Sequence, residues 1–325
     1  MKDTKLIRTE ERQNCPCCGA DHITLHSGLS DRIFGASGSW SMSQCSNAGC
    51  QLAWLNPSPL ESDIVKAYQQ YYTHTPNQAD DPSTGTSIFK AIQLGYATLL
   101  GCAAERSSME VYFLDRETPG RVLEVGSGNG VRLKRLVDLG WDGEGQEIDV
   151  AAADMASSLG LQVHSGSIYD TYFSGKKYDR IVSNHVLEHL HDPAGMMIRC
   201  RELLGEKGEI TVITPNICSF GSRLFGRNWR GLEPPRHIQI YSPASLRQLL
   251  LNCGYSEISV FSSAARADLV MTGSINLAFC GSLTSSHARP SLANAVMTTL
   301  LWALARLSNF IYRDSGEELV AIARK

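Results

Sequence analysis

One ten-residue segment, residues 121–130 (RVLEVGSGNG), constrains the fold more than any other part of the chain. Its apolar first half predicts a buried parallel strand, and its glycines at every second position predict a tight turn that opens into a helix over 131–139. Such glycines let a ligand lie against bare backbone, as in nucleotide-binding turns. A dinucleotide fingerprint would need G-x-G-x-x-G, whereas the third glycine here comes one residue early, and the Lys-Ser/Thr of a P-loop is lacking.

Strand and helix patterns alternate after this turn. The predicted helices cover 151–159, 194–204 and 243–252, and the predicted strands cover 161–164, 179–185, 209–214, 257–261 and 317–323. Alternation of this kind indicates an α/β domain with helices on both faces of the sheet. We therefore expect a Rossmann-like, doubly wound, mainly parallel sheet of seven strands.

The motif E-x-G-x-G-x-G, from Glu124 to Gly130, is followed by an acidic residue, Glu147, at the end of the next predicted strand. This combination resembles class I S-adenosylmethionine-dependent methyltransferases. The resemblance implies that S-adenosylmethionine lies along the turn and that Glu147 binds its ribose hydroxyls, with Asp149 the less favoured candidate. The alternative from the residues alone is a plain strand-to-helix turn that binds nothing.

Two further segments extend the resemblance to the rest of the cofactor. It implies that Ser167 and Ile168 lie beside the adenine, although many relatives carry aspartate where Ser167 stands. In KYDRIVSNHVLEHLHDP it implies that His185 lies beside the methionine half. The implied cofactor-binding residues are Glu124, Gly126, Ser127, Gly128, Gly130, Glu147, Ile148, Ser167, Ile168, Asn184 and His185.

The same segment contains His185-Val-Leu-Glu188-His189, which fits the H-x-x-E-H pattern of zinc metalloproteases. That site needs both histidines and the glutamate on one helix. Here the pattern directly follows a predicted strand and soon meets Asp192-Pro193, which leaves room for only a short helical turn. We favour structural hydrogen bonds by Glu188 and His189 over a protease site.

Two close cysteine pairs near the start, Cys15/Cys18 and Cys45/Cys50, are separated by strand-like sequence. Four thiolates brought together in this way suit tetrahedral Zn2+, and four protein ligands make the site structural because they leave no open position. Cys17 could replace either neighbour. We predict a small zinc-ribbon-like domain over 1–59, a helical linker and cap over 60–118, and the methyltransferase domain over 119–325.

The zinc module and the linker after it also resemble sugar C-methyltransferases, in which a tyrosine from this region can overhang the acceptor pocket. In PRHIQIYS, His237 takes the histidine position of a Glu-His pair in that family, which implies a general base. A histidine titrates near neutral pH and can take the proton of an attacking hydroxyl. The alternative is a capping or core histidine. Arg236 replaces the glutamate of the pair, so C-methylation is not implied by this match.

The loop before His237 carries four arginines, at 223, 227, 230 and 236, against one acid, Glu233. Arginine forks bind phosphate oxygens well, so the loop favours an acceptor that carries a diphosphate, with a solvated basic loop as the equal alternative. We expect a methyltransferase acting on a nucleotide-activated sugar or glycan intermediate. The alternatives are O-methylation of a quinone or small aromatic lying under Tyr71, Tyr72 or Trp229, and a zinc-dependent interaction module without turnover.

Composition limits the partners and the compartment. A net charge of −3 gives no global field for nucleic acid, and the charged N-terminal stretch has no apolar core of a secretory signal, so a cytoplasmic protein is expected. An insertion over 263–315 contains an apolar segment, 291–312, of bilayer-spanning length. Because it contains Arg306 and must return to supply the last strand, we expect a cover helix or a subunit contact. A membrane-surface helix, which would make the protein peripheral to the membrane, is the alternative.

Overall fold

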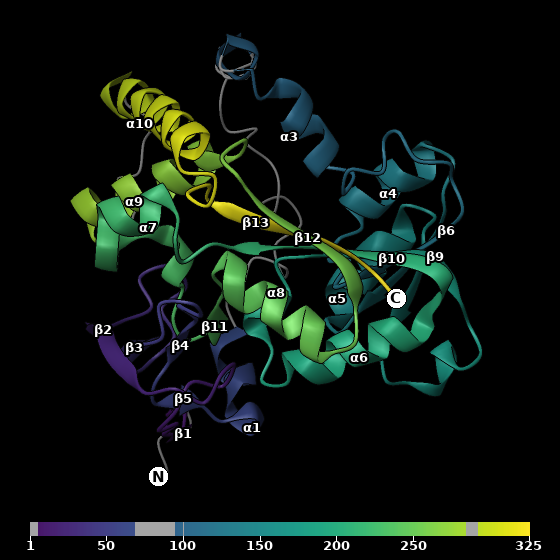
Figure 1. Ribbon diagram of the computed structural model, residues 1–325, viewed down its shortest axis with the longest axis horizontal. Coiled ribbons are helices and arrows are strands. Elements are labelled where there is room, and N and C mark those ends of the chain that lie inside the picture. The colour runs from purple at the N-terminus through teal and green to yellow at the C-terminus, as the bar shows by residue number, and fades with distance from the viewer. Residues whose placement is uncertain (1–5, 69–94, 100, 284–291) are drawn as a thin grey trace.

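The computed structural model describes residues 6–68, 95–99, 101–283 and 292–325, and its centre is a seven-stranded sheet (Figure 1). The strand order is β12-β13-β10-β9-β6-β7-β8. Only β13 runs antiparallel to its neighbours, β10 and β12, and the other neighbouring pairs are parallel. This arrangement confirms the predicted fold class. The strands are β6 (Arg121–Val125), β7 (Asp142–Glu147), β8 (Gln162–Ser165), β9 (Tyr178–Asn184), β10 (Leu204–Pro215), β12 (Ser256–Ser263) and β13 (Glu318–Arg324).

Both faces of this sheet are buried. Leu123 and Ile181 pack into a core on one side, together with residues of α6 and α8, whereas their neighbours Val122 and Val182 pack into a second core on the other side. Alternating side chains of a strand point to opposite faces, so near-continuous apolar strands indicate helices on both sides. The helices here are α3 (Ala103–Met109), α4 (Val131–Asp138), α5 (Val150–Ser158), α6 (Pro193–Leu203), α7 (Phe220–Phe225) and α8 (Pro243–Asn252).

The N-terminal module is built on a smaller antiparallel sheet with the order β11-β4-β3-β2. Three strands come from the first 59 residues, but β11 (Gln239–Ile240) comes from the segment that follows His237. The predicted boundary at residue 59 therefore cuts through a shared sheet. The other strands are β2 (His22–Leu29), β3 (Trp40–Cys45) and β4 (Ala53–Leu55), and a separate pair is formed by β1 (Thr9–Glu10) and β5 (Ser58–Pro59).

The helix expected after this module is short within the described residues. Helix α1 (Glu61–Ile64) continues into a 3-10 turn, η1 (Val65–Tyr68). Tyr71 and Tyr72, predicted as candidate acceptor contacts, lie outside the described residues.

The late insertion forms α9 (Ala267–Cys280) and α10 (Leu292–Ile311), which pack side by side at one end of the sheet (Figure 1). Trp302 and Ala305 of α10 are buried, and Arg306 pairs with Glu105 of α3 at 2.7 Å. We call the opposite, exposed face of α10 the apolar stripe; it consists of Val296, Leu300, Leu304, Leu307 and Ile311. The expected cover helix is present, and across the described ranges no helix combines the length and apolar character needed to cross a bilayer.

Candidate cofactor and acceptor site

A cavity of about 1470 Å³ opens at the carboxyl ends of β6, β7 and β9. Ligands bind at this edge in open α/β sheets. Every residue predicted to contact the cofactor lines the cavity except Gly130. The lining set is Glu124, Gly126, Ser127, Gly128, Glu147, Ile148, Ser167, Ile168, Asn184 and His185.

The glycine turn has positive φ angles at Gly126, Gly128 and Gly130 (71°, 52° and 78°), which favour glycine. A Cβ on Gly126 would lie 2.3 Å from the side chain of Val186, whereas a Cβ on Gly128 would meet nothing within 4 Å. Gly130 begins α4, and a Cβ there would lie 2.7 Å from the Cβ of Ala156 in α5. The structure therefore gives Gly130 a role in helix packing rather than in lining the cavity.

The two acids after β7 have separate environments. Glu147 accepts hydrogen bonds from the backbone N–H groups of Gly128 (2.8 Å) and Asp149 (2.9 Å), so its carboxylate is held against the glycine turn. Asp149 caps α5 by accepting from the N–H groups of Ala151 and Ala152. Of the two candidates, Glu147 is the one that joins the turn to the cavity wall.

Two polar atoms in this wall match a polar ligand. Among the described residues, Ser127 Oγ and Asn184 Oδ1 are buried and have no hydrogen-bond partner. Buried polar groups are satisfied in the great majority of native proteins, so such atoms at a cavity point to a bound molecule that completes them. The cavity residues therefore fit S-adenosylmethionine, which carries hydroxyl, amino and carboxylate groups along its length.

Two ionisable groups border the turn. Glu124 is fully buried beneath it and accepts a hydrogen bond from the hydroxyl of Tyr112; burial raises its pKa to about 7. His185 lies between two carboxylates, with Nδ1 3.0 Å from Glu188 and Nε2 2.7 Å from Glu318. Burial lowers the pKa of His185, but these two partners outweigh it and raise the value to about 9. His185 therefore presents a cation to the cavity.

The four predicted zinc ligands come together near the first sheet. The Sγ atoms of Cys15, Cys18, Cys45 and Cys50 lie within 4.8 Å of one another, with Cys15–Cys50 at 3.7 Å and Cys18–Cys45 at 3.4 Å. Four thiolates at about 2.3 Å from one Zn2+ would be about 3.8 Å apart in a tetrahedron. This donor set fits structural Zn2+. Cys17 is outside the cluster, and its Sγ faces the carbonyl oxygen of Ser245 at 3.9 Å.

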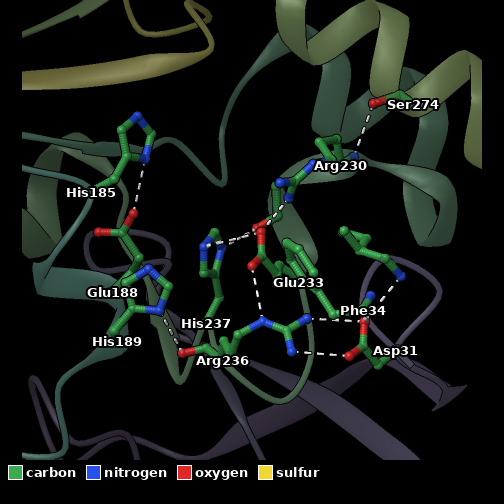
Figure 2. A network of polar contacts seen from close by, with 12 residues as sticks. Asp31, Phe34, His185, Glu188, His189, Arg230, Glu233, Arg236, His237 and Ser274 are labelled. Atoms are coloured by element: carbon green, nitrogen blue, oxygen red, sulfur yellow. Dashed lines mark hydrogen bonds and ion pairs between the residues drawn. The ribbon is translucent and has the colours of Figure 1, made fainter. Parts of the chain in front are cut away.

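The four arginines of the loop before His237 do not converge. Arg223 and Arg227 do not line the cavity, and Arg227 donates to the backbone carbonyl of Gly28 in the N-terminal module. Arg230 lines the cavity and pairs with Glu233. Arg236 is fully buried and pairs with Glu233 at 3.0 Å and with Asp31 at 2.9 Å (Figure 2).

Glu233 is the centre of this network. Burial raises its pKa, but the charges of Arg230 and Arg236 outweigh burial and hold the value well below the usual range. Glu233 is therefore an anion that the two arginines already neutralise, and the loop resembles a scaffold more than an open phosphate site.

His237 lines the cavity and is buried. Its Nδ1 donates to the carbonyl of Gly231 at 2.7 Å, which leaves the lone pair on Nε2, 3.8 Å from Glu233. Burial lowers the pKa of His237 to about 4. The ring is neutral at pH 7 and, as the implied general base, it would be weak.

The H-x-x-E-H segment does not lie on one helix. His185 follows the end of β9, and Glu188 and His189 belong to the 3-10 turn η4 (Leu187–His189). The geometry that the protease pattern requires is therefore not present at these residues. Sequence reasoning missed that His189 packs against His237, with ring centroids 4.8 Å apart, because the two residues are 48 positions apart in the chain.

Comparisons with known proteins agree with this geometry. Residues 104–260 match a family model described as a methyltransferase domain. This match covers 157 of the 325 residues, which is slightly less than half of the chain. A ubiquinone biosynthesis O-methyltransferase of Cereibacter sphaeroides (strain ATCC 17025 / ATH 2.4.3) is 27% identical over 150 residues, which is 42% of this chain and 61% of the relative. The match thus spans about three fifths of the length of that relative.

Solved structures show weaker likeness. A SAM-dependent methyltransferase from Archaeoglobus fulgidus has a TM-score of 0.46 and 18% identity, over 69% of this chain and 94% of that one. Phosphoethanolamine N-methyltransferase 2 of Haemonchus contortus, in complex with S-adenosyl-L-methionine, has a TM-score of 0.44 and 14% identity, over 67% of this chain and 52% of that one.

Proposed function

We propose that the protein transfers the methyl group of S-adenosylmethionine to a small-molecule acceptor bound in the cavity. The observation that carries this proposal is the glycine turn held to Glu147 beside the unsatisfied polar atoms of Ser127 and Asn184. S-adenosylmethionine supplies a methyl group on a positively charged sulfur.

The cavity residues would divide the binding of this cofactor among them. Glu147 can accept from the ribose hydroxyls, because each of its oxygens keeps a free lone pair beside the backbone N–H that it binds. Ile168 is an apolar cavity residue suited to the adenine ring. Holding the methyl group close to the attacking atom lowers the entropic barrier to transfer.

For the acceptor, we favour O-methylation of a quinone-like or small aromatic molecule over an activated sugar or glycan intermediate. The arginine loop gives an acceptor phosphate no dedicated site, since Arg230 and Arg236 are paired with Glu233 and the other two arginines do not line the cavity. The name of the curated relative points to the same class. The hypothesis of an activated-sugar acceptor is still supported by the zinc module and by the position of His237.

The first test is calorimetric titration of the purified, zinc-replete protein with S-adenosylmethionine and its demethylated product, with NADH as the control ligand. We expect both sulfur compounds to bind and NADH not to bind. Glu147→Ala should weaken binding at least about tenfold, since one charge-assisted hydrogen bond is worth 1.5–3 kcal/mol. Asp142→Ala is the matched control, because Asp142 is an exposed acid at the other end of the same strand.

Failure of the folded protein to bind either sulfur compound would contradict the proposal and favour the interaction-module reading. The acceptor class is tested next by product mass after incubation with phosphate-free aromatic alcohols or with nucleotide sugars. Methylation of nucleotide sugars alone would overturn the aromatic assignment while leaving the cofactor assignment intact.

A further inference from the structure

Three side chains at the part of the cavity lined by His237 form a second cluster of potential metal ligands. The ligand atoms of Glu188, His189 and His237 all lie within 4.8 Å of one another. His189 and His237 line the cavity, and Glu188 is fully buried behind them (Figure 2). The cluster joins the turn after β9 to the loop before β11, so it forms only in the folded chain.

Backbone carbonyls fix the tautomers of both histidines. His237 donates its Nδ1–H to Gly231, as described above. Nδ1 of His189 lies 3.1 Å from both the carbonyl oxygen of Arg236 and the hydroxyl oxygen of Tyr68. The carbonyl can only accept and the hydroxyl can also accept, so we assign the proton to this nitrogen. Each ring therefore keeps its lone pair on Nε2. Histidines that bind metals almost always donate the other ring N–H to a carbonyl or carboxylate in this way.

The carboxylate of Glu188 makes the kind of hydrogen bonds that orient metal-binding carboxylates. One oxygen of Glu188 faces Nδ1 of His185 at 3.0 Å, and the other accepts from the hydroxyl of Thr214 at 2.9 Å. Outer-shell hydrogen bonds of this kind orient ligating carboxylates and leave lone pairs for a cation. Donor atoms bound to one cation at about 2.1 Å lie at most about 4.2 Å apart, so shifts below about 1 Å would close the site.

We propose that Glu188, His189 and His237 bind one divalent transition-metal cation, separate from the cysteine site. Two imidazoles and one carboxylate suit Mn2+, Fe2+ or Zn2+, and three protein ligands leave positions open for an oxygen of the acceptor.

This inference rests on the proposed methyl transfer and deepens it. When the lone pair on Nε2 of His237 binds the cation, it is not available to take a proton from the acceptor. A bound cation lowers the pKa of a hydroxyl that it contacts, so the O–H bond breaks with its proton passing to water. The oxygen then attacks the methyl carbon: a C–O bond forms, the S–CH3 bond breaks, and the electron pair of that bond returns to sulfur. The preferred acceptor is thus a hydroxyl, and His237 acts as a ligand.

The test uses the full chain after dialysis against a weak chelator, with one Zn2+ per chain retained at the four thiolates. Mn2+ is the probe, because thiolates select zinc whereas carboxylate and water suit Mn2+. Titration followed by the spectroscopic signal of free Mn2+ is expected to show about one Mn2+ bound per chain. His189→Ala and His237→Ala should abolish this uptake, and the milder Thr214→Val should weaken it by about 10–100-fold.

His191→Ala is the matched control, since His191 belongs to the same loop and its Nε2 binds the carbonyl of Pro59; its Mn2+ uptake should equal that of the wild type. S-adenosylmethionine binding, measured on the same samples, reports that each variant is folded. A wild-type protein that binds S-adenosylmethionine but takes up no Mn2+ would overturn the metal site, as would variants that bind Mn2+ equally well. Uptake of Mn2+ without binding of S-adenosylmethionine would instead contradict the methyltransferase proposal and leave the metal site standing.

Discussion

The buried ion pair between Asp31 and Arg236 gives a stability prediction whose size follows from its geometry. Asp31 comes from the N-terminal module and meets the guanidinium of Arg236 with both oxygens, at 2.9 and 3.0 Å, and neither side chain is exposed. The same carboxylate accepts from the backbone N–H groups of Ile33, Phe34 and Ala36. In Asp31→Asn, the new amide N–H group must face other donors.

Removing one partner of a buried ion pair costs about 3–5 kcal/mol. We expect Asp31→Asn to lie near the lower limit, at about 3 kcal/mol, because Glu233 still compensates the charge of Arg236 at 3.0 Å. The free energy of unfolding is measured by urea titration, followed by far-ultraviolet circular dichroism and tryptophan fluorescence.

The control is Asp21→Asn, a change at an exposed acid of the same module, which should alter stability by no more than about 0.5 kcal/mol. If Asp31→Asn were as stable as this control, the ion pair would not hold the module to the loop, and the reasoning from burial would be refuted.

Three further predictions concern charge, metal and surface. Burial raises the pKa of Glu124 to about 7, so the protonated carboxyl group contributes stability that is fully present below pH 4.5 and is lost as the pH rises through 7. Between pH 4.5 and pH 8, the free energy of unfolding of the wild type should therefore fall by up to about 3 kcal/mol relative to that of Glu124→Gln. Urea-unfolding experiments in which both proteins change equally with pH would contradict this prediction. Strong chelators should remove Zn2+ from the four cysteines, unfold the N-terminal module and so change the fluorescence of the buried Trp54. The substitution Cys18→Ser should have the same effect. Unchanged fluorescence in metal-free protein would refute a structural zinc site. If the apolar stripe binds membranes, Leu300→Glu and Leu304→Glu should reduce co-flotation of the protein with phospholipid vesicles. Both substitutions are at exposed positions, so the free energy of unfolding should stay within about 0.5 kcal/mol of the wild-type value. A wild-type protein that does not float with the vesicles would exclude a membrane-surface helix.

Local sequence patterns predicted most of the fold and the part of the site formed by the glycine turn and Glu147. The spacing of Gly126 and Gly128 and the acid at Glu147 specify a strand, a turn and the next strand end, which are neighbours in any doubly wound sheet. The same spacing includes Gly130 among the implied cofactor-binding residues, but spacing does not report that Ala156 of α5 packs against it.

The part of the site around His237 depends on contacts between residues that are far apart in the sequence. Asp31 and Arg236 are 205 positions apart, and His189 and His237 are 48 apart, so neither pairing leaves a sequence pattern. The H-x-x-E-H pattern likewise does not predict which histidines come together. Glu188 and His189 do assemble with a second histidine, but it is His237, whereas His185 turns toward Glu318.

The position of β11 has a consequence for how the chain folds during synthesis. The four cysteines are translated before the strand that completes their sheet. Strand β4, however, pairs through Ala53 and Trp54 with Gln239 and Ile240, which are translated much later. Until then, the nascent module presents an open strand edge of the kind that invites wrong pairing. The sheet of this module is therefore completed only when the segment that follows His237 has been synthesised.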